Sequence, residues 1–187
     1  MACNIDGEER NFSNIQFSIK SHQSQKPFLE YMLAGEYSEK ENARTIAIFW
    51  AGNQGDKKFN AKGKGFTEID KGSVLTDADG RIMEGTETQS VFKELIGIYS
   101  TTYYDKKTKI EENYSSELQK NINFKLDIFN SNNSIFEGKA SGLLEIENKN
   151  EGGKLLGKED FVREGILGKT KQIDCYFRAK NSNSQEK

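Results

Sequence analysis

The chain has few of the residues from which catalytic relays and metal centres are built. Its 187 residues include one histidine and two cysteines. A zinc site made of these residue types needs about four ligands, so the count excludes it. His22 lies in a polar stretch before Pro27, the only proline, and no G-x-S-x-G motif accompanies it. The sequence therefore lacks the signature of a Ser-His-Asp or Cys-His relay.

Long apolar runs and an excess of one charge are also missing. No apolar run approaches the roughly eighteen residues of a transmembrane helix, so no transmembrane segment is predicted. The 27 basic and 29 acidic residues are interspersed and leave a net charge of −2. Without a basic face, nucleic acid is not an expected partner. The AKGKG stretch around Gly63 and Gly65 lacks the spacing of a phosphate loop, and we expect no cofactor.

Apolar residues are scarce, and aromatic residues offset the shortage. Hydrophobic residues make up 34% of the chain, and the mean hydropathy is −0.79. Twelve Phe and seven Tyr are present, and each aromatic side chain buries a large area. The length fits one domain. We therefore expect one domain with an aromatic core.

Strict alternation of apolar and polar residues is the strongest pattern, and it is typical of strands with one buried face. It occurs in NIQFSIK from Asn14, NINFKLDIF from Asn121 and QIDCYFRA from Gln172. Further expected strands are RTIAIFWAG, PFLEYMLAGEY, ELIGIYSTTYY and REGILGK. Two segments have weak helical character, SVFKELIGIY, where strand is favoured, and SSELQKN, a single turn at best. YYDKKTKI and IFNSNNSIF are expected to be hairpin turns.

These patterns predict an all-β fold: a single antiparallel β-barrel, or a strongly curved sheet, of about 8–10 strands with little helix. We expect a flexible N-terminal segment over residues 1–10, the β domain over 11–180 and a disordered tail over 181–187.

One stretch of the sequence is repeated in altered form. FNAKGKGFTEI from Phe59 returns as FEGKASGLLEI from Phe136, 77 residues later, with five of eleven positions identical. A glycine interrupts each copy, Gly65 in the first and Gly142 in the second. Glycine within a strand often marks a bulge or a barrel corner, so both are predicted to be structural. The alternative is convergence of strand patterns in a chain rich in Gly and Lys.

The two cysteines allow several interpretations. Cys175 has the apolar parity of its strand, which favours a small buried side chain. A Cys3–Cys175 disulfide would tie the two ends of the chain together and require an oxidising compartment. Alternatively, Cys3 is the first residue of a mature bacterial lipoprotein with an added Met. The chain is expected to be cytoplasmic if MACNIDGEER is its native start, which is too polar for a signal peptide, and in the cell envelope or secreted otherwise.

The stretch NNSIFEGKASG resembles the G-x-F-x-G-x-x-G hairpin of the allene oxide cyclase and dirigent-like β-barrel group. The matching residues are Ser134, Phe136, Glu137, Gly138 and, one residue late, Gly142. The resemblance implies an antiparallel barrel with an apolar cavity that shapes a reactive ligand. It carries over no catalytic residue.

The expected function is that of a non-catalytic binding protein, which uses a barrel cavity or its outer face for a small apolar molecule or a protein partner. Trp50, Phe124 and Phe177 are the candidate ligand contacts. For Trp50 the reason is that barrels often place aromatic residues at the floor or mouth of a cavity, and plain core packing is the alternative. Two alternatives are a dirigent- or cyclase-like isomerase that confines an apolar substrate, and a lipid-anchored bacterial surface protein.

DADGRIMEGTE resembles part of a calcium loop, with Asp77 and Asp79 at ligand positions. Leu75 and Thr86 occupy the positions where such a loop needs Asp and Glu. An Asp-Gly hairpin turn explains the same residues, so no metal site is expected. We predict that millimolar calcium leaves the melting temperature unchanged in a thermal-shift assay. A clear rise that Asp79→Ala abolishes would contradict the hairpin interpretation.

Overall fold

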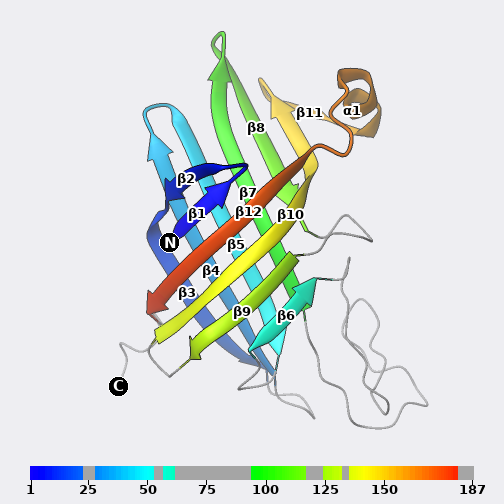
Figure 1. Ribbon diagram of the computed structural model, residues 1–187. Helices are drawn as coiled ribbons and strands as arrows, with labels where there is room; N and C mark the ends of the chain where they lie inside the picture. The colour runs from blue at the N-terminus through cyan, green and yellow to red at the C-terminus, as the bar shows by residue number, and fades with distance from the viewer. Residues whose placement is uncertain (23–27, 53–56, 62–93, 117–123, 132–134, 181–187) are drawn as a thin grey trace, which may run out of the picture.

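The computed structural model describes residues 1–22, 28–52, 57–61, 94–116, 124–131 and 135–180. This part of the chain is all-β with one short helix, which confirms the predicted fold class. Its twelve strands form one antiparallel sheet that curls into a half-barrel (Figure 1), the strongly curved form of the expected architecture. No helix in these residues is long and apolar enough to cross a membrane.

The sheet has a continuous main path and two side branches. Its order is β2-β1-β12-β10-β8-β7-β5-β4-β3, with β11 paired to β10 and the pair β9–β6 attached to β10. The strand bounds are β1 Ala2–Ile5, β2 Glu8–Asn11, β3 Ser13–His22, β4 Phe28–Glu39, β5 Asn42–Gly52, β6 Lys58–Ala61, β7 Glu94–Asp105, β8 Thr108–Ser115, β9 Phe124–Ser131, β10 Ile135–Glu151, β11 Lys154–Leu156 and β12 Thr170–Lys180.

The connection between β2 and β3 requires the sheet to curl. These two strands are at opposite ends of the sheet order, yet Phe12 alone separates them in sequence. Phe12 and Met1 exchange hydrogen bonds: Phe12 N donates to Met1 O at 2.8 Å, and the Met1 amino group donates to Phe12 O at 3.0 Å. Because one residue spans the distance between the two ends, the sheet cannot lie flat.

Strand parity follows the sequence pattern. In β9, Phe124, Leu126 and Ile128 are buried, whereas Lys125 and Asp127 are exposed. The same alternation buries four residues of β12, namely Ile173, Cys175, Phe177 and Ala179. The segment YYDKKTKI forms the β7–β8 hairpin, and both of its central residues, Lys106 and Lys107, have positive φ (46° and 73°). Such a turn matches the twist of paired strands.

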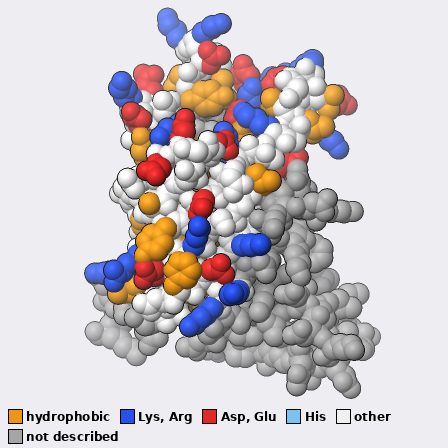
Figure 2. All heavy atoms as spheres, in the orientation of Figure 1, with side chains coloured by type: hydrophobic (Ala, Val, Ile, Leu, Met, Phe, Trp, Pro, Cys, Tyr) orange, Lys and Arg blue, Asp and Glu red, His pale blue; other side chains and the backbone are white. Residues whose placement is uncertain are grey.

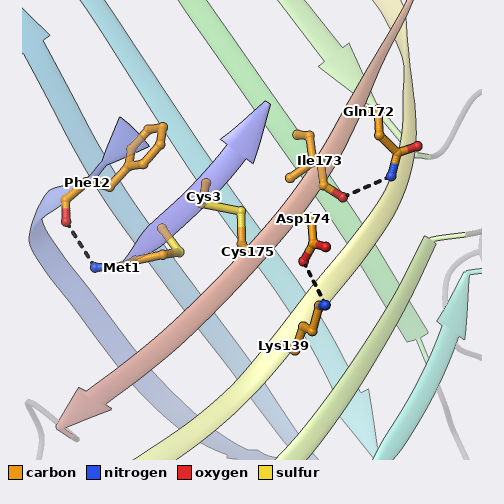
Figure 3. The surroundings of a disulfide bond; sticks show 8 residues. All are labelled: Met1, Cys3, Phe12, Lys139, Gln172, Ile173, Asp174 and Cys175. Atoms are coloured by element: carbon orange, nitrogen blue, oxygen red, sulfur yellow. Dashed lines mark hydrogen bonds and ion pairs between the residues drawn. A yellow bond between two sulfur atoms is a disulfide. The ribbon is translucent and has the colours of Figure 1, made fainter. Parts of the chain in front are cut away.

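The N-terminal residues differ from the flexible segment expected over 1–10. They form β1 and β2, which join at an Asp6-Gly7 turn. β1 pairs with β12, and Cys3 lies directly opposite Cys175, to which it is disulfide-bonded (Figure 3). Both cysteines are buried. The sulfur of Cys3 cannot carry a lipid thioether while this bond exists, so the lipid-anchored alternative requires the reduced protein.

One expected strand is wrong. REGILGK was predicted to be extended, but Arg163 and Glu164 end the helix α1 (Lys158–Glu164) and the next residues form turns. Gly165 and Gly168 have φ of 67° and 75°, left-handed values that interrupt a strand. Acidic residues in the first turn of α1 suit the positive end of the helix dipole.

The long strand β10 changes partner at Gly142. One side of β10 pairs with β12 as far as Glu145, while the other side pairs with β9 up to Ser141 and with β8 from Glu145 onward. Gly142 has φ of 149°, a value that other residues rarely adopt, and lies in the gap between the two partners. The register shifts of β10 lie elsewhere, between Glu137 and Gly138 and between Ile146 and Asn148.

The two copies of the repeated stretch both meet β9. The first copy begins in β6 and the second in β10, and these strands pair with opposite sides of β9. Phe59 lies opposite Leu126, whereas Phe136 lies opposite Ser131, so the two copies use different registers. Gly65 and the remainder of the first copy, like the turn at Asp77 and Asp79 and the tail over 181–187, lie outside the described residues.

An aromatic cluster packs inside the half-barrel, at the end of β4 and β5 that is far from the hairpin joining them. The rings of Tyr31 and Trp50 stack with centroids 5.0 Å apart. Phe136 contacts Phe17 at 4.7 Å and Tyr31 at 5.4 Å, and Phe177 lies 6.3 Å from Trp50. The aromatic core expected from composition is therefore present.

The outer face of β9, β10 and β12 carries mixed side chains. Figure 2 shows both charges interspersed with apolar groups on the visible face. Lys139 and Asp174 form an ion pair across β10 and β12 at 3.1 Å, near the exposed ring of Tyr176 (45% exposed). This pattern agrees with the interspersed charge of the sequence.

We predict that Phe124→Ala lowers the free energy of unfolding by about 3–5 kcal/mol. The Phe124 ring is 1% exposed and covers Gly97, where an added Cβ would lie 2.5 Å from its Cζ atom. The control Lys125→Ala, on the exposed face of the same strand, should change stability by less than about 0.5 kcal/mol. Chemical denaturation measures both, and equal losses would contradict the strand facing.

Candidate functional site: a polar pocket at the mouth of the half-barrel

Toward one end of the half-barrel, three strands each place a charged residue on their inward face. Arg44 in β5, Glu112 in β8 and Lys171 in β12 have the same parity as the buried residues of their strands. Arg44 lies opposite Thr101 of β7, which lies opposite Glu112. Arg44, Thr101 and Glu112 therefore form one row across the sheet. The adjacent inward-facing row consists of Ile46, Tyr99 and Tyr114.

This row forms one wall of a pocket of about 380 Å³. The opposite wall comes from β1, β2, β12 and the turn before β12. The three strands of this wall pass in front of the β5 and β7 part of the sheet in Figure 1. The pocket is lined by Ile5, Asp6, Glu8, Arg10, Arg44, Tyr99, Thr101, Tyr103, Glu112, Lys169 and Lys171. Seven of these eleven residues carry a charge at neutral pH, so the mouth of the half-barrel differs sharply from its aromatic interior.

Glu112 is the most deeply buried charged group of the pocket, with 5% of its surface exposed. Its carboxylate accepts hydrogen bonds from the Tyr114 hydroxyl at 2.6 Å, the Tyr103 hydroxyl at 3.3 Å and the Lys169 amino group at 3.1 Å. Lys169 also lies 5.9 Å from the centroid of the Tyr114 ring. A buried carboxylate is tolerated when it is paired and hydrogen-bonded in this way.

The network fixes the protonation states of its members. Burial raises the pKa of Glu112, but the hydrogen bonds from Tyr114 and Lys169 outweigh burial and hold that pKa below its ordinary value. Burial and the hydrogen bond to Glu112 raise the pKa of the Tyr114 hydroxyl far above its ordinary value. At neutral pH, Glu112 is therefore an anion and Tyr114 a neutral donor.

A second ion pair supports the wall made by β12. Lys171 donates to Asp6 Oδ2 at 2.7 Å, and the backbone N–H of Gln172 donates to Asp6 Oδ1 at 2.8 Å. Burial raises the pKa of Asp6, but these bonds and the Lys171 charge lower it below its ordinary value. The Cys3–Cys175 disulfide joins the same two strands three and four residues away from Asp6 and Lys171, and so fixes this wall.

Two arginines, one from each wall, lie near Tyr37 at the pocket. The guanidinium groups of Arg10 and Arg44 lie 5.8 Å and 5.6 Å from the centroid of the Tyr37 ring. Arg10 pairs with Glu8 at 2.5 Å, while its buried Nε atom has no partner among the described residues. Arg44 forms no ion pair within the described part of the chain.

The candidate ligand contacts from the sequence lie apart from this pocket. Trp50, Phe124 and Phe177 are at most 2% exposed and belong to the hydrophobic core. Trp50 contacts Phe177, but none of the three lines the pocket. A signal for the pocket was present in the sequence. Arg44, Glu112 and Lys171 are charged, yet each stands at a strand position where the alternation places inward-facing apolar residues. Sequence reasoning missed this signal because it followed the aromatic residues.

The chemistry of the pocket is that of charged and hydroxyl groups. No cluster of three or more His, Cys, Asp or Glu suited to a metal ion occurs in the described residues. Carboxylates, guanidinium groups and amino groups can recognise a polar ligand through charge-assisted hydrogen bonds. No family model, no curated protein and no solved structure matches this chain.

We predict that Glu112→Gln lowers the free energy of unfolding at pH 7 by about 1–3 kcal/mol, because Lys169 loses its anionic partner. The pKa of Glu112 is depressed in the folded state, so its contribution is present above the unfolded value of about 4.3 and is lost as pH falls through the lower native value. The difference between wild type and variant should therefore shrink in acid.

Denaturation curves between neutral and acidic pH measure this difference. The control is Glu111→Gln on the same strand, where the side chain is partly exposed and forms an ion pair only with Lys109 within the described part. Its effect should stay within about 0.5 kcal/mol. A Glu112→Gln difference that is constant with pH would rule out the ionised state of Glu112.

Proposed function

We propose that the protein is a non-catalytic binding protein that holds a small polar molecule in the pocket at the mouth of the half-barrel. The observation that carries this proposal is a concave, charged pocket of about 380 Å³ above an interior filled by aromatic side chains. The volume falls in the range of roughly 300–1,000 Å³ that is usual for small-molecule sites.

The lining favours a polar ligand over the apolar one expected from the sequence. Ile5 is the only aliphatic side chain among the lining residues, and the aromatic ones, Tyr99 and Tyr103, each carry a hydroxyl group. Residues suited to an apolar ligand, such as Trp50 and Phe177, already pack against each other in the core. An apolar molecule in this pocket would desolvate charged groups without pairing them, which costs free energy.

The state of Glu112 favours binding over catalysis. A general base works best when its pKa lies near the working pH. The hydrogen bonds to Glu112 lower its pKa instead, and they occupy its oxygens with three donors. Nothing on the described residues specifically favours the isomerase alternative, which needs an apolar cavity, or the lipid-anchored alternative, which needs the Cys3 sulfur.

We predict that a thermal-shift screen of sugars, sugar acids and amino acids finds compounds that stabilise the protein. A ligand at about a hundred times its Kd stabilises by about 2.7 kcal/mol, which is about 5–10 °C for a chain of this size. Thr101→Trp, which fills the pocket, should abolish the stabilisation. Its matched control is Thr102→Trp, since Thr102 neighbours Thr101 on β7 but does not line the pocket.

Three results would contradict the proposal. They are a screen without any stabilising compound, stabilisation that persists in Thr101→Trp, and stabilisation by apolar compounds alone. Each of these results would argue against a binding site for polar molecules at the mouth of the half-barrel.

A further inference from the structure

We infer that the ligand of the mouth pocket is a hydroxylated small anion, and that Arg44, assisted by Arg10, binds its negative group. This inference rests on the proposed function and specifies the ligand class for the same pocket.

The charges of the pocket are paired with one exception. Its charged lining residues comprise four cations and three anions. Three pairs account for six of them: Lys169 with Glu112 at 3.1 Å, Lys171 with Asp6 at 2.7 Å and Arg10 with Glu8 at 2.5 Å. Arg44 remains without a carboxylate in the described part of the chain. The pocket therefore has a net positive charge, located on the side of Arg44.

The surroundings of Arg44 hold its guanidinium group at the pocket. Arg44 lies between Tyr37 of β4 and Thr101 of β7 in the same cross-strand row, and it is partly buried. Its guanidinium group lies 5.6 Å from the Tyr37 ring centroid, a distance at which cation–π attraction stabilises it. A guanidinium group presents five N–H donors, and a carboxylate or phosphate can accept two of them side by side.

Arg10 adds a second cation from the opposite wall. It belongs to β2, and its guanidinium group lies 5.8 Å from the same Tyr37 ring. Its partner Glu8 is 66% exposed in its side chain, so water screens that ion pair. The buried Nε of Arg10 has no acceptor among the described residues. An anion in the pocket would therefore be attracted by a cation on each of the two walls, Arg44 on one and Arg10 on the other.

The neighbouring lining residues explain the hydroxylated part of the ligand class. Thr101 separates Arg44 from Glu112 along the row, and it shares a hydrogen bond with Tyr99. The hydroxyl groups of Thr101, Tyr99 and Tyr103 both donate and accept hydrogen bonds. A ligand with several hydroxyl groups beside one negative group would satisfy them. Sugar acids and sugar phosphates share this chemistry.

The test compares three probes that share the pyranose ring and differ only at C6: glucose, glucuronate and glucose 6-phosphate. Isothermal titration calorimetry at pH 7 and low salt should show that at least one of the two anions binds about ten- to a hundredfold more tightly than glucose. The carboxylate and phosphate arms show which anionic group the pocket prefers. Raising the salt concentration should weaken the binding of the anion and leave that of glucose unchanged.

Variants assign the effect to the arginine. Arg44→Gln should remove the advantage of the anion over glucose. Arg178→Gln is the matched control, because Arg178 is an exposed arginine on β12 that does not line the pocket; it should bind all three probes as the wild type does. If Arg44→Gln does not fold, Arg44→Lys carries the test, since it keeps the charge but loses the two-pronged geometry, and it should bind the preferred anion several-fold more weakly.

The outcomes separate this inference from the proposed function. If glucose binds as well as either anion, and Thr101→Trp abolishes that binding, the inference is wrong and the proposed function stands. The inference also fails if an anion is preferred but Arg44→Gln and Arg44→Lys leave the preference unchanged. If neither glucose nor either anion binds the wild type, the inference is overturned, and the screen with Thr101→Trp decides the proposed function independently.

Discussion

The rest of the structure depends on the passage of the chain from β2 to β3 through the single residue Phe12. These strands are at the two ends of the sheet order, so the nine strands of the main path must curl until their ends lie within the reach of one residue. The paired hydrogen bonds between Phe12 and Met1 and the Cys3–Cys175 disulfide hold the N-terminal hairpin in this position. β1 and β2 then face β5 and β7, and the pocket exists because of that opposition.

The interior of the half-barrel has two zones, one apolar and one charged, which are stabilised by different interactions. Around Trp50, aromatic rings from several strands stack and exclude water, which supplies the hydrophobic stabilisation that a chain with 34% hydrophobic residues needs. Around Glu112, charges lie close to the same core, and the buried carboxylate of Glu112 is stable there because three donors hydrogen-bond to it. The hydroxyl of Tyr114 donates to Glu112 while its ring lies opposite Tyr99 in the layer below. Tyr114 therefore connects the apolar zone to the polar one.

The fold was largely accessible from the sequence, whereas the candidate site was not. Alternation along β9 and β12 identified strands and their buried faces correctly, because parity within a strand is a local property. The extended interpretation of residues 163–169 failed because the left-handed turns at Gly165 and Gly168 do not show in an apolar pattern. Arg44, Glu112 and Lys171 are separated by more than fifty residues along the chain, and no local motif relates them.

The sequence by itself determined that the chain is all-β and antiparallel, that its core is aromatic, and which side chains of β9 and β12 point inward. Short-range sterics and the two-residue period of a strand suffice for these conclusions. Only the tertiary structure decided that Cys3 meets Cys175, that residues 1–10 belong to the sheet, and that Arg44 and Glu112 share one row of a pocket. These features depend on which strands become neighbours and in which register, and that choice is made by packing between segments far apart in the chain.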